Sequence, residues 1–108
     1  MYQPWGYAAL MSMGQQPRRH SALSKALADE IRAQRRAVEM SQDELGKRAG
    51  VSRGQVIRIE NGERVLDVTQ VDAISRALGV SMVELFQRAE ARVAAEQGGD
   101  AAAKVAGQ

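Results

Sequence analysis

The 108-residue chain contains no cysteine, one histidine and only two prolines, and 4% of its residues are aromatic. The absence of cysteine excludes disulfide bonds and thiolate metal sites, so the fold must be stabilised by a packed core. The sequence has no run of about 18 apolar residues, the length that a membrane-spanning helix requires. Its apolar N-terminal stretch has no basic residue ahead of it and is a poor signal peptide. We therefore expect one small cytoplasmic domain.

The side chains that carry most enzyme chemistry are scattered in this sequence. His20 has no second histidine or cysteine with which to bind a metal, and the serines have no partner base. Asp43 and Glu44 are adjacent, which suits the first turn of a helix better than two catalytic carboxylates facing each other across a cleft. We expect neither enzyme activity nor a bound metal or cofactor.

Apolar residues recur every three or four positions in several stretches, such as Leu23, Leu27 and Ile31, and both prolines precede Arg18. This spacing places the residues on one face of a helix, and no stretch alternates with the period of two expected of a strand. Four helix starts are marked by an N-cap residue with Glu or Gln three positions later: Ser41, Ser52, Asp67 and Ser81. The predicted fold is all-α, with helices at residues 22–37, 42–49, 53–61, 68–78 and 82–96.

The two ends of the chain differ from this pattern. Residues 1–20 contain both prolines and three of the four aromatic residues but no acid, and we interpret them as a flexible N-terminal arm. Met11 and Met13 leave open where the natural protein starts. Residues 98–108 are predicted to form a flexible C-terminal tail, so we expect the globular domain at residues 21–97.

Residues 41–62 predict two short capped helices joined by the turn Gly50-Val51-Ser52. A glycine-containing turn between short helices is typical of a helix-turn-helix. Gly46 lies where the two helices would approach most closely, so a missing Cβ is useful at that position. We expect Val56 and Ile59 of the second helix to point inward and to contact apolar residues of the first.

The opposite face of the second helix has an unusual composition for a solvated surface. It combines arginines with an isoleucine and a glycine: Arg53, Gly54, Ile57, Arg58 and Asn61. Arginine can contact guanine with two hydrogen bonds, an apolar side chain can meet a thymine methyl group, and glycine allows close approach. This face is therefore suited to the major groove of DNA. The alternative for Ile57 is an ordinary exposed apolar residue, which is common in proteins.

Several further segments occur in register with this motif: Ser41-Gln42, Glu44-Leu45, Ala49-Gly50-Val51-Ser52, Ile59-Glu60-Asn61-Gly62, Ala77-Leu78-Gly79-Val80-Ser81 and Glu84-Leu85-Phe86. On these residues, the region from about Leu27 to Phe86 resembles the lambda-repressor-like family of Cro/repressor-type (XRE) helix-turn-helix proteins. The resemblance covers more than half of the chain. It implies a compact five-helix DNA-binding domain with the helix-turn-helix at its second and third helices.

The resemblance also implies a role for particular residues. Four of them would face base edges: Arg53, Gly54, Ile57 and Arg58. Five would contact the DNA backbone or support that contact: Gln42, Ser52, Gln55, Asn61 and Arg64. Arg35 and Glu60 match a structural ion pair that ties the first helix to the third. The alternative for this pair is two independent surface charges.

The sequence departs from the family pattern at three points. Gly54 lies inside the recognition helix, where glycine costs roughly 1 kcal/mol relative to alanine. Glu39 stands where the family usually has glycine, which puts the shape of the first loop in doubt. No second globular domain follows the motif, so a role like that of the large self-cleaving repressors is not expected.

Two extensions of the motif remain open. Arg18 and Arg19 lie in an acid-free segment and are candidates for an arm along the DNA, the alternative being a solubilising segment. The fifth helix continues its apolar stripe through Ala89 and Val93. That stripe is expected to pack against a second subunit or the aromatic arm, unless the helix simply frays at its end.

Taken together, the motifs favour a regulator of transcription that binds specific sites in double-stranded DNA, without any membrane contact. A single recognition helix covers only a few base pairs, so we expect a homodimeric repressor on a roughly palindromic site. The alternative from another class is a protein-interaction module with the same fold, an antitoxin or a coactivator, whose protein partner would bind the fifth helix or the tails.

Overall fold

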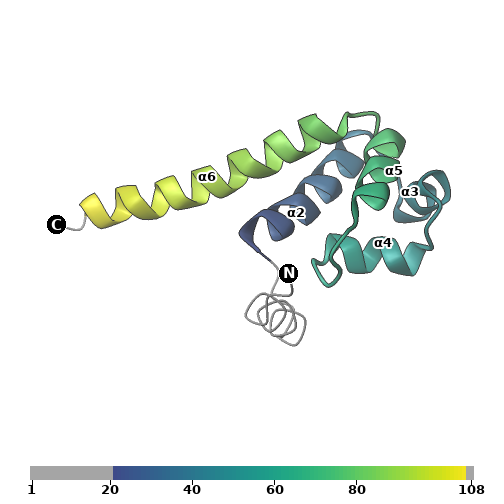
Figure 1. The fold of residues 1–108 in the computed structure, drawn as a ribbon, viewed down its shortest axis with the longest axis horizontal. Coiled ribbons are helices and arrows are strands. Elements are labelled where there is room, and N and C mark those ends of the chain that lie inside the picture. Colours follow the sequence, from purple (N-terminus) through teal and green to yellow (C-terminus); the bar gives the residue numbers. More distant parts are fainter. Residues whose placement is uncertain (1–20, 107–108) are drawn as a thin grey trace, which may run out of the picture.

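The computed structural model describes the backbone of residues 21–106 and the side chains of residues 21–97. Figure 1 shows the five α-helices of this range. They are α2 (Ala22–Ala37), α3 (Gln42–Ala49), α4 (Arg53–Glu60), α5 (Val68–Leu78) and α6 (Met82–Ala106). No strand occurs between residues 21 and 106, and the predicted all-α class is confirmed. The candidate arm, with Arg18, Arg19 and His20, lies outside the described residues.

The helix starts follow the capping signals in the sequence. The Oγ atoms of Ser21, Ser41 and Ser81 each accept a hydrogen bond from the backbone N–H three residues later. Ser52 and Asp67 form complete capping boxes, in which the glutamine three residues later also accepts from the cap's own N–H. Each of these bonds gives a partner to an amide that the helix itself cannot satisfy, so the sequence determines where each helix begins.

The core lies where the helices meet. Figure 1 shows α2 and α6 running antiparallel side by side, with α3, α4 and α5 gathered at one end of this pair. Ile31 of α2 and Leu85 and Ala89 of α6 are completely buried. Leu45 of α3 and Val56 of α4 are 1% exposed and join the same apolar cluster. The long helix pair therefore supports the short helices that form the candidate site.

The apolar stripe of α6 packs in part against α2 of the same chain. Ala89 is buried, and Val93 is partly buried against the common core. Polar contacts hold the same pair together, because Arg92 forms an ion pair with Glu30, and Arg88 Nη1 donates to Gln34 Oε1 at 2.8 Å. Ala89 thus packs within the chain, whereas Val93 also lines an open groove with Leu23 and Glu90. The expectation that this stripe receives a second subunit or the N-terminal arm stays a prediction.

The last helix is longer than its sequence pattern predicted. The apolar pattern predicts an end near residue 96, because residues 98–108 are weakly patterned, but the backbone is helical to Ala106. Residues 101–103 are three alanines, the strongest helix formers, and no proline follows to end the helix. The expectation of a flexible tail at residues 98–108 is therefore corrected for residues 98–106, which are helical.

The loop between α2 and α3 contains a residue in an unusual conformation. Glu39 has a φ of 55°, in the left-handed region that glycine adopts without strain. This is the position at which the family usually has glycine. The loop keeps the conformation that glycine would allow, at the expense of strain at Glu39. Its backbone is fixed on both sides, because Glu39 and Met40 donate hydrogen bonds to Arg36 and Arg35 carbonyl oxygens.

None of the helices between residues 21 and 106 combines the length and hydropathy needed to cross a bilayer. Among the side chains of residues 21–97, no group of three or more histidine, aspartate or glutamate residues gathers closely enough to hold a metal ion.

Candidate nucleic-acid interface

α3 and α4 form a helix-turn-helix whose two helices approach closely at Gly46. A Cβ placed on Gly46 would lie 2.6 Å from the carbonyl oxygen of Val51, so any side chain there would push the turn away. Gly50 ends α3 in the left-handed conformation, with a φ of 77°. The Val51 N–H then donates to Gly46 O at 2.9 Å. The turn thus fixes the orientation of α4 relative to α3 through backbone contacts.

α4 has an inner and an outer face. Val56 and Ile59 are 1% and 2% exposed and contact the core, as their spacing predicts. On the outer face, Arg53, Gly54 and Arg58 are exposed and Ile57 is half-buried. The four residues expected to face base edges therefore lie on the solvent side of α4. This surface offers two guanidinium groups, one apolar side chain and one bare stretch of backbone.

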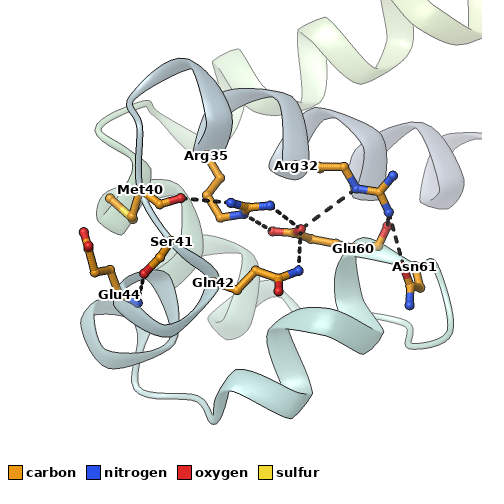
Figure 2. A network of polar contacts seen from close by, with 8 residues as sticks. All are labelled: Arg32, Arg35, Met40, Ser41, Gln42, Glu44, Glu60 and Asn61. Carbon is orange, nitrogen blue, oxygen red and sulfur yellow. Dashed lines mark hydrogen bonds and ion pairs between the residues drawn. The ribbon is translucent and has the colours of Figure 1, made fainter.

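A buried ion pair joins α4 to α2. Figure 2 shows the guanidinium group of Arg35 facing the carboxylate of Glu60, with Arg35 Nε 2.6 Å from Oε2 and Nη2 3.0 Å from Oε1. The Glu60 side chain is 1% exposed and that of Arg35 is 12% exposed. Arg35 Nη1 also donates to the Met40 carbonyl at 2.9 Å. The two residues matched by the family resemblance are thus paired in the structure, with bidentate geometry.

Two further side chains complete this network in Figure 2. Gln42 Nε2 donates to Glu60 Oε1 at 3.2 Å, so the amide expected to contact a DNA phosphate also contacts the buried acid. An amide has two donor hydrogens, and the second remains free for another acceptor. Arg32, which the sequence analysis did not select, donates from Nη2 to the Glu60 carbonyl at 2.8 Å and to Asn61 Oδ1 at 3.3 Å.

The remaining candidates for backbone contacts occupy two different places. Ser52 and Gln55 form the capping box at the start of α4, where Ser52 Oγ accepts from Gln55 N at 3.1 Å and Gln55 Oε1 accepts from Ser52 N at 2.9 Å. The Ser52 hydroxyl hydrogen and the Gln55 amide hydrogens are left as donors. Arg64 lies elsewhere: it lines a mostly apolar groove with Leu23 and Val68.

An open groove separates the starts of α3 and α4. Its lining residues are Arg35, Arg36, Ser41, Gln42, Asp43 and Arg53. The N-terminal end of α3 carries partial positive charge, and Arg36 and Arg53 add two exposed guanidinium groups. Asp43 brings one negative charge, which Lys47 pairs at 3.2 Å. The groove therefore has the chemistry to accept a phosphate oxygen.

Arg36 is a further groove residue that was not predicted to contact DNA, although the sequence contains a signal for it. Arg32, Arg35 and Arg36 follow the i, i+3, i+4 spacing that places side chains on one face of a helix. That face of α2 is the one that meets α4 and the groove. A basic triplet at helical spacing, one helix before a helix-turn-helix, would have identified both missed arginines.

Two short helices fixed by a tight turn, the second with a basic and partly apolar outer face, are the arrangement of a helix-turn-helix DNA-binding protein. Comparison with known families agrees: residues 31–85, about half of the chain, match the family described as helix-turn-helix. The chain belongs to this family. It is a DNA-binding transcriptional regulator of the Cro/repressor type with the lambda-repressor-like fold.

Solved structures with the same fold include regulators of several kinds. The clp gene regulator ClgR from Corynebacterium glutamicum has a TM-score of 0.72 and 23% sequence identity, covering 81% of this chain and 93% of that one. The restriction-modification controller protein C.Esp1396I has a TM-score of 0.63 and 25% identity, over 69% and 95% of the two chains. The restriction-modification controller protein C.AhdI from Aeromonas hydrophila has a TM-score of 0.55 and 28% identity, covering 58% of this chain and 94% of that one. A search of curated protein sequences found no match.

Proposed function

We propose that this chain is a sequence-specific repressor that binds double-stranded DNA as a homodimer and reads the major groove with α4. The observation that carries the proposal is the outer face of α4, where Arg53, Gly54 and Arg58 are exposed and Ile57 is half-buried. We propose no enzyme activity, and a cytoplasmic location where the protein meets the chromosome.

In this proposal the bases are read by two kinds of contact. Arg53 and Arg58 each place five N–H donors at the surface, and arginine is suited to the paired acceptors O6 and N7 of guanine. Ile57, which lies between these two arginines in the sequence, offers an apolar contact to a thymine methyl group. The orientation of these side chains depends on the Arg35–Glu60 pair, because that pair fixes the C-terminal end of α4 to α2.

The DNA backbone is contacted from the groove between α3 and α4. The Arg36 guanidinium group and the free donor of Gln42 line a position suited to one phosphate, beside Arg53, which is left to read the bases. The Ser52 hydroxyl and the Gln55 amide supply further donors beside it. We include Arg18 and Arg19 as an arm that adds phosphate contacts, since they precede α2 by only a few residues.

A second copy is required because one α4 reaches only a few base pairs. We place the dimer contact at the groove beside the loop that follows α4, where apolar side chains are exposed. Leu23 is 38% exposed, Val65 52% and Val68 71%, and the groove beside them is mostly apolar. Contact there would join two chains, so that two α4 helices read the two half-sites of one duplex.

The structure provides less support for a protein-interaction module such as an antitoxin or a coactivator. That alternative relies on the last helix and the two tails, and Ala89 of the last helix is buried within the chain, so this part of its surface is not free for a partner. DNA binding explains the two exposed arginines on α4, whereas a partner that binds the last helix or the tails does not need them. DNA binding therefore accounts for more of the described surface.

Selection from random duplex DNA tests the proposal, followed by a mass measurement of the selected complex. We expect one enriched motif with two inverted half-sites about 10 base pairs apart, and two chains per duplex. With about 6–10 phosphate contacts, the affinity should fall by about 10³–10⁵-fold between roughly 50 and 200 mM salt. Binding that selects no motif, or that is insensitive to salt, would overturn the proposal.

A further inference from the structure

The fold explains why glycine occupies four of the five glycine positions between residues 21 and 97. Gly46 has no room for a Cβ, because the Val51 carbonyl oxygen would lie 2.6 Å from it. Gly50, Gly62 and Gly79 have φ values from 72° to 77°, a region that other residues enter only with strain. For these four positions, the backbone itself explains the residue.

The fold does not explain why glycine occupies position 54. It lies in the first turn of α4, is exposed and does not have a positive φ. A Cβ built on it would find only Ser52 Oγ within 4 Å, at 3.9 Å, which is an ordinary van der Waals contact. Alanine is the better helix former, so the free domain would be more stable with alanine at this position. The benefit of glycine must therefore come from something that contacts α4 from outside.

The neighbours of Gly54 on the helix surface indicate what that contact is. Residues three and four positions apart share a face, so Gly54, Ile57 and Arg58 lie together. Because Gly54 has no side chain, nothing projects from the helix at this position beside the half-buried Ile57, and we call the space between these two residues the notch. Among the groups that line the major groove, the one that matches an apolar notch is the 5-methyl group of thymine.

We propose that Gly54 determines specificity, with the notch between Gly54 and Ile57 receiving the methyl group of one thymine in each half-site. This inference rests on the proposed function, because it requires that α4 enters the major groove. It predicts that a methyl group added to the protein and the methyl group of that thymine compete for the same space.

This prediction is tested by adding a methyl group to the protein and by removing a methyl group from the DNA. In the DNA site selected by the wild-type chain, each thymine is replaced in turn by deoxyuridine, which lacks only the methyl group. We expect one position per half-site at which this replacement weakens wild-type binding by about 3–10-fold. Gly54→Ala should bind the unmodified site at least about 10-fold more weakly and should recover affinity when deoxyuridine occupies that same position.

Two controls separate this effect from damage to the fold. Gly54→Ala should raise the melting temperature by about 3 °C, because alanine favours the helix. Ile57→Ala removes the wall of the notch and should abolish the sensitivity to deoxyuridine at that position. A lower melting temperature for Gly54→Ala would instead give glycine a role in the fold and overturn the inference.

The outcomes also separate this inference from the proposed function. If the wild-type chain selects no motif, the proposed function fails and the inference fails with it. If a motif is selected but every deoxyuridine leaves binding unchanged, only the role of Gly54 is overturned. The same conclusion follows if Gly54→Ala binds as tightly as the wild type, or shows no recovery at any thymine.

Discussion

Glu60 places an acid at the end of the helix that we propose reads DNA, and its surroundings decide what that charge does. The carboxylate is buried and accepts hydrogen bonds from Arg35 and Gln42, while Arg32 Nε lies 3.9 Å away. An exposed acid here would repel phosphates. Paired in this way, Glu60 presents little negative charge to the outside and fixes α4 against α2.

Removal of Arg35 should therefore be costly. We expect Arg35→Met to lower the free energy of unfolding by about 3–5 kcal/mol, because the Glu60 carboxylate stays buried without its main partner. The double variant Arg35→Met/Glu60→Leu should recover much of this loss, since no unpaired charge remains. Urea unfolding measures both, with the exposed Arg36→Met as a control that stays within about 0.5 kcal/mol of the wild type. Equal losses in the single and double variants would contradict a buried pair.

Glu39 is the second residue whose behaviour follows from local geometry. Its φ of 55° is strained for a residue with a Cβ. We expect Glu39→Gly to raise the free energy of unfolding by about 0.5–1 kcal/mol, since the strain relieved exceeds the extra entropy that glycine gains in the unfolded chain. Thermal unfolding measures the change. A less stable variant would mean that the Glu39 side chain contributes contacts that outweigh the strain.

At the scale of helices, the contact between α3 and α4 depends on the missing side chain at Gly46. Gly46→Ala should destabilise the domain by roughly 1–3 kcal/mol, because the new methyl group meets a backbone oxygen that cannot move without opening the turn. Gly54→Ala is the matched control, because it adds the same methyl group at a position where a Cβ makes no close contact. A melting temperature for Gly46→Ala as high as that for Gly54→Ala would contradict the close approach.

The sequence predicted the starts of these helices well, because capping is a local interaction. Ser52 and Gln55, or Asp67 and Gln70, are three residues apart and satisfy each other's backbone amides in any helix that begins there. The ends of α3 and α5 are local in the same way, since Gly50 and Gly79 adopt the left-handed conformation there. The end of α6 was not predicted, since a pair of glycines within an alanine-rich segment weakens a helix without necessarily ending it.

The partners of individual side chains were harder to predict from the sequence. Periodicity gives the face of a helix on which Glu30 or Gln34 lies, but not which side chain of a helix more than 50 residues away will meet it. The Arg35–Glu60 pair was found only through the family resemblance. The spacing of Arg32, Arg35 and Arg36 could have placed all three on one face of α2, but the contacts of Arg32 with Glu60 and Asn61 depend on how α2 crosses α4, which is a property of the packed domain.

For the whole molecule, the proposed dimer contact makes its own prediction. Val68→Glu should weaken self-association at least about 10-fold, because a charge would be buried in an apolar interface. The fold should tolerate the change, since Val68 is 71% exposed and begins α5, where an acid is favourable. Sedimentation of the free protein measures the monomer–dimer equilibrium.

Val83→Glu is the matched control for this prediction. Val83 is 63% exposed in the first turn of α6, so the substitution has the same chemistry at a different surface. It should leave self-association unchanged. If the two variants behave alike, the dimer does not form through the groove beside the loop that follows α4.

The central claim is that the outer face of α4 reads base sequence, and one measurement tests it most directly. Selection from random duplex DNA is carried out in parallel with the wild-type chain and with Arg58→Ala. We expect both to enrich the same motif, with the preference at one guanine in each half-site lost from the variant and its affinity for the wild-type site reduced by about 1–3 kcal/mol. An identical motif with every preference retained would show that α4 does not read the bases with this face.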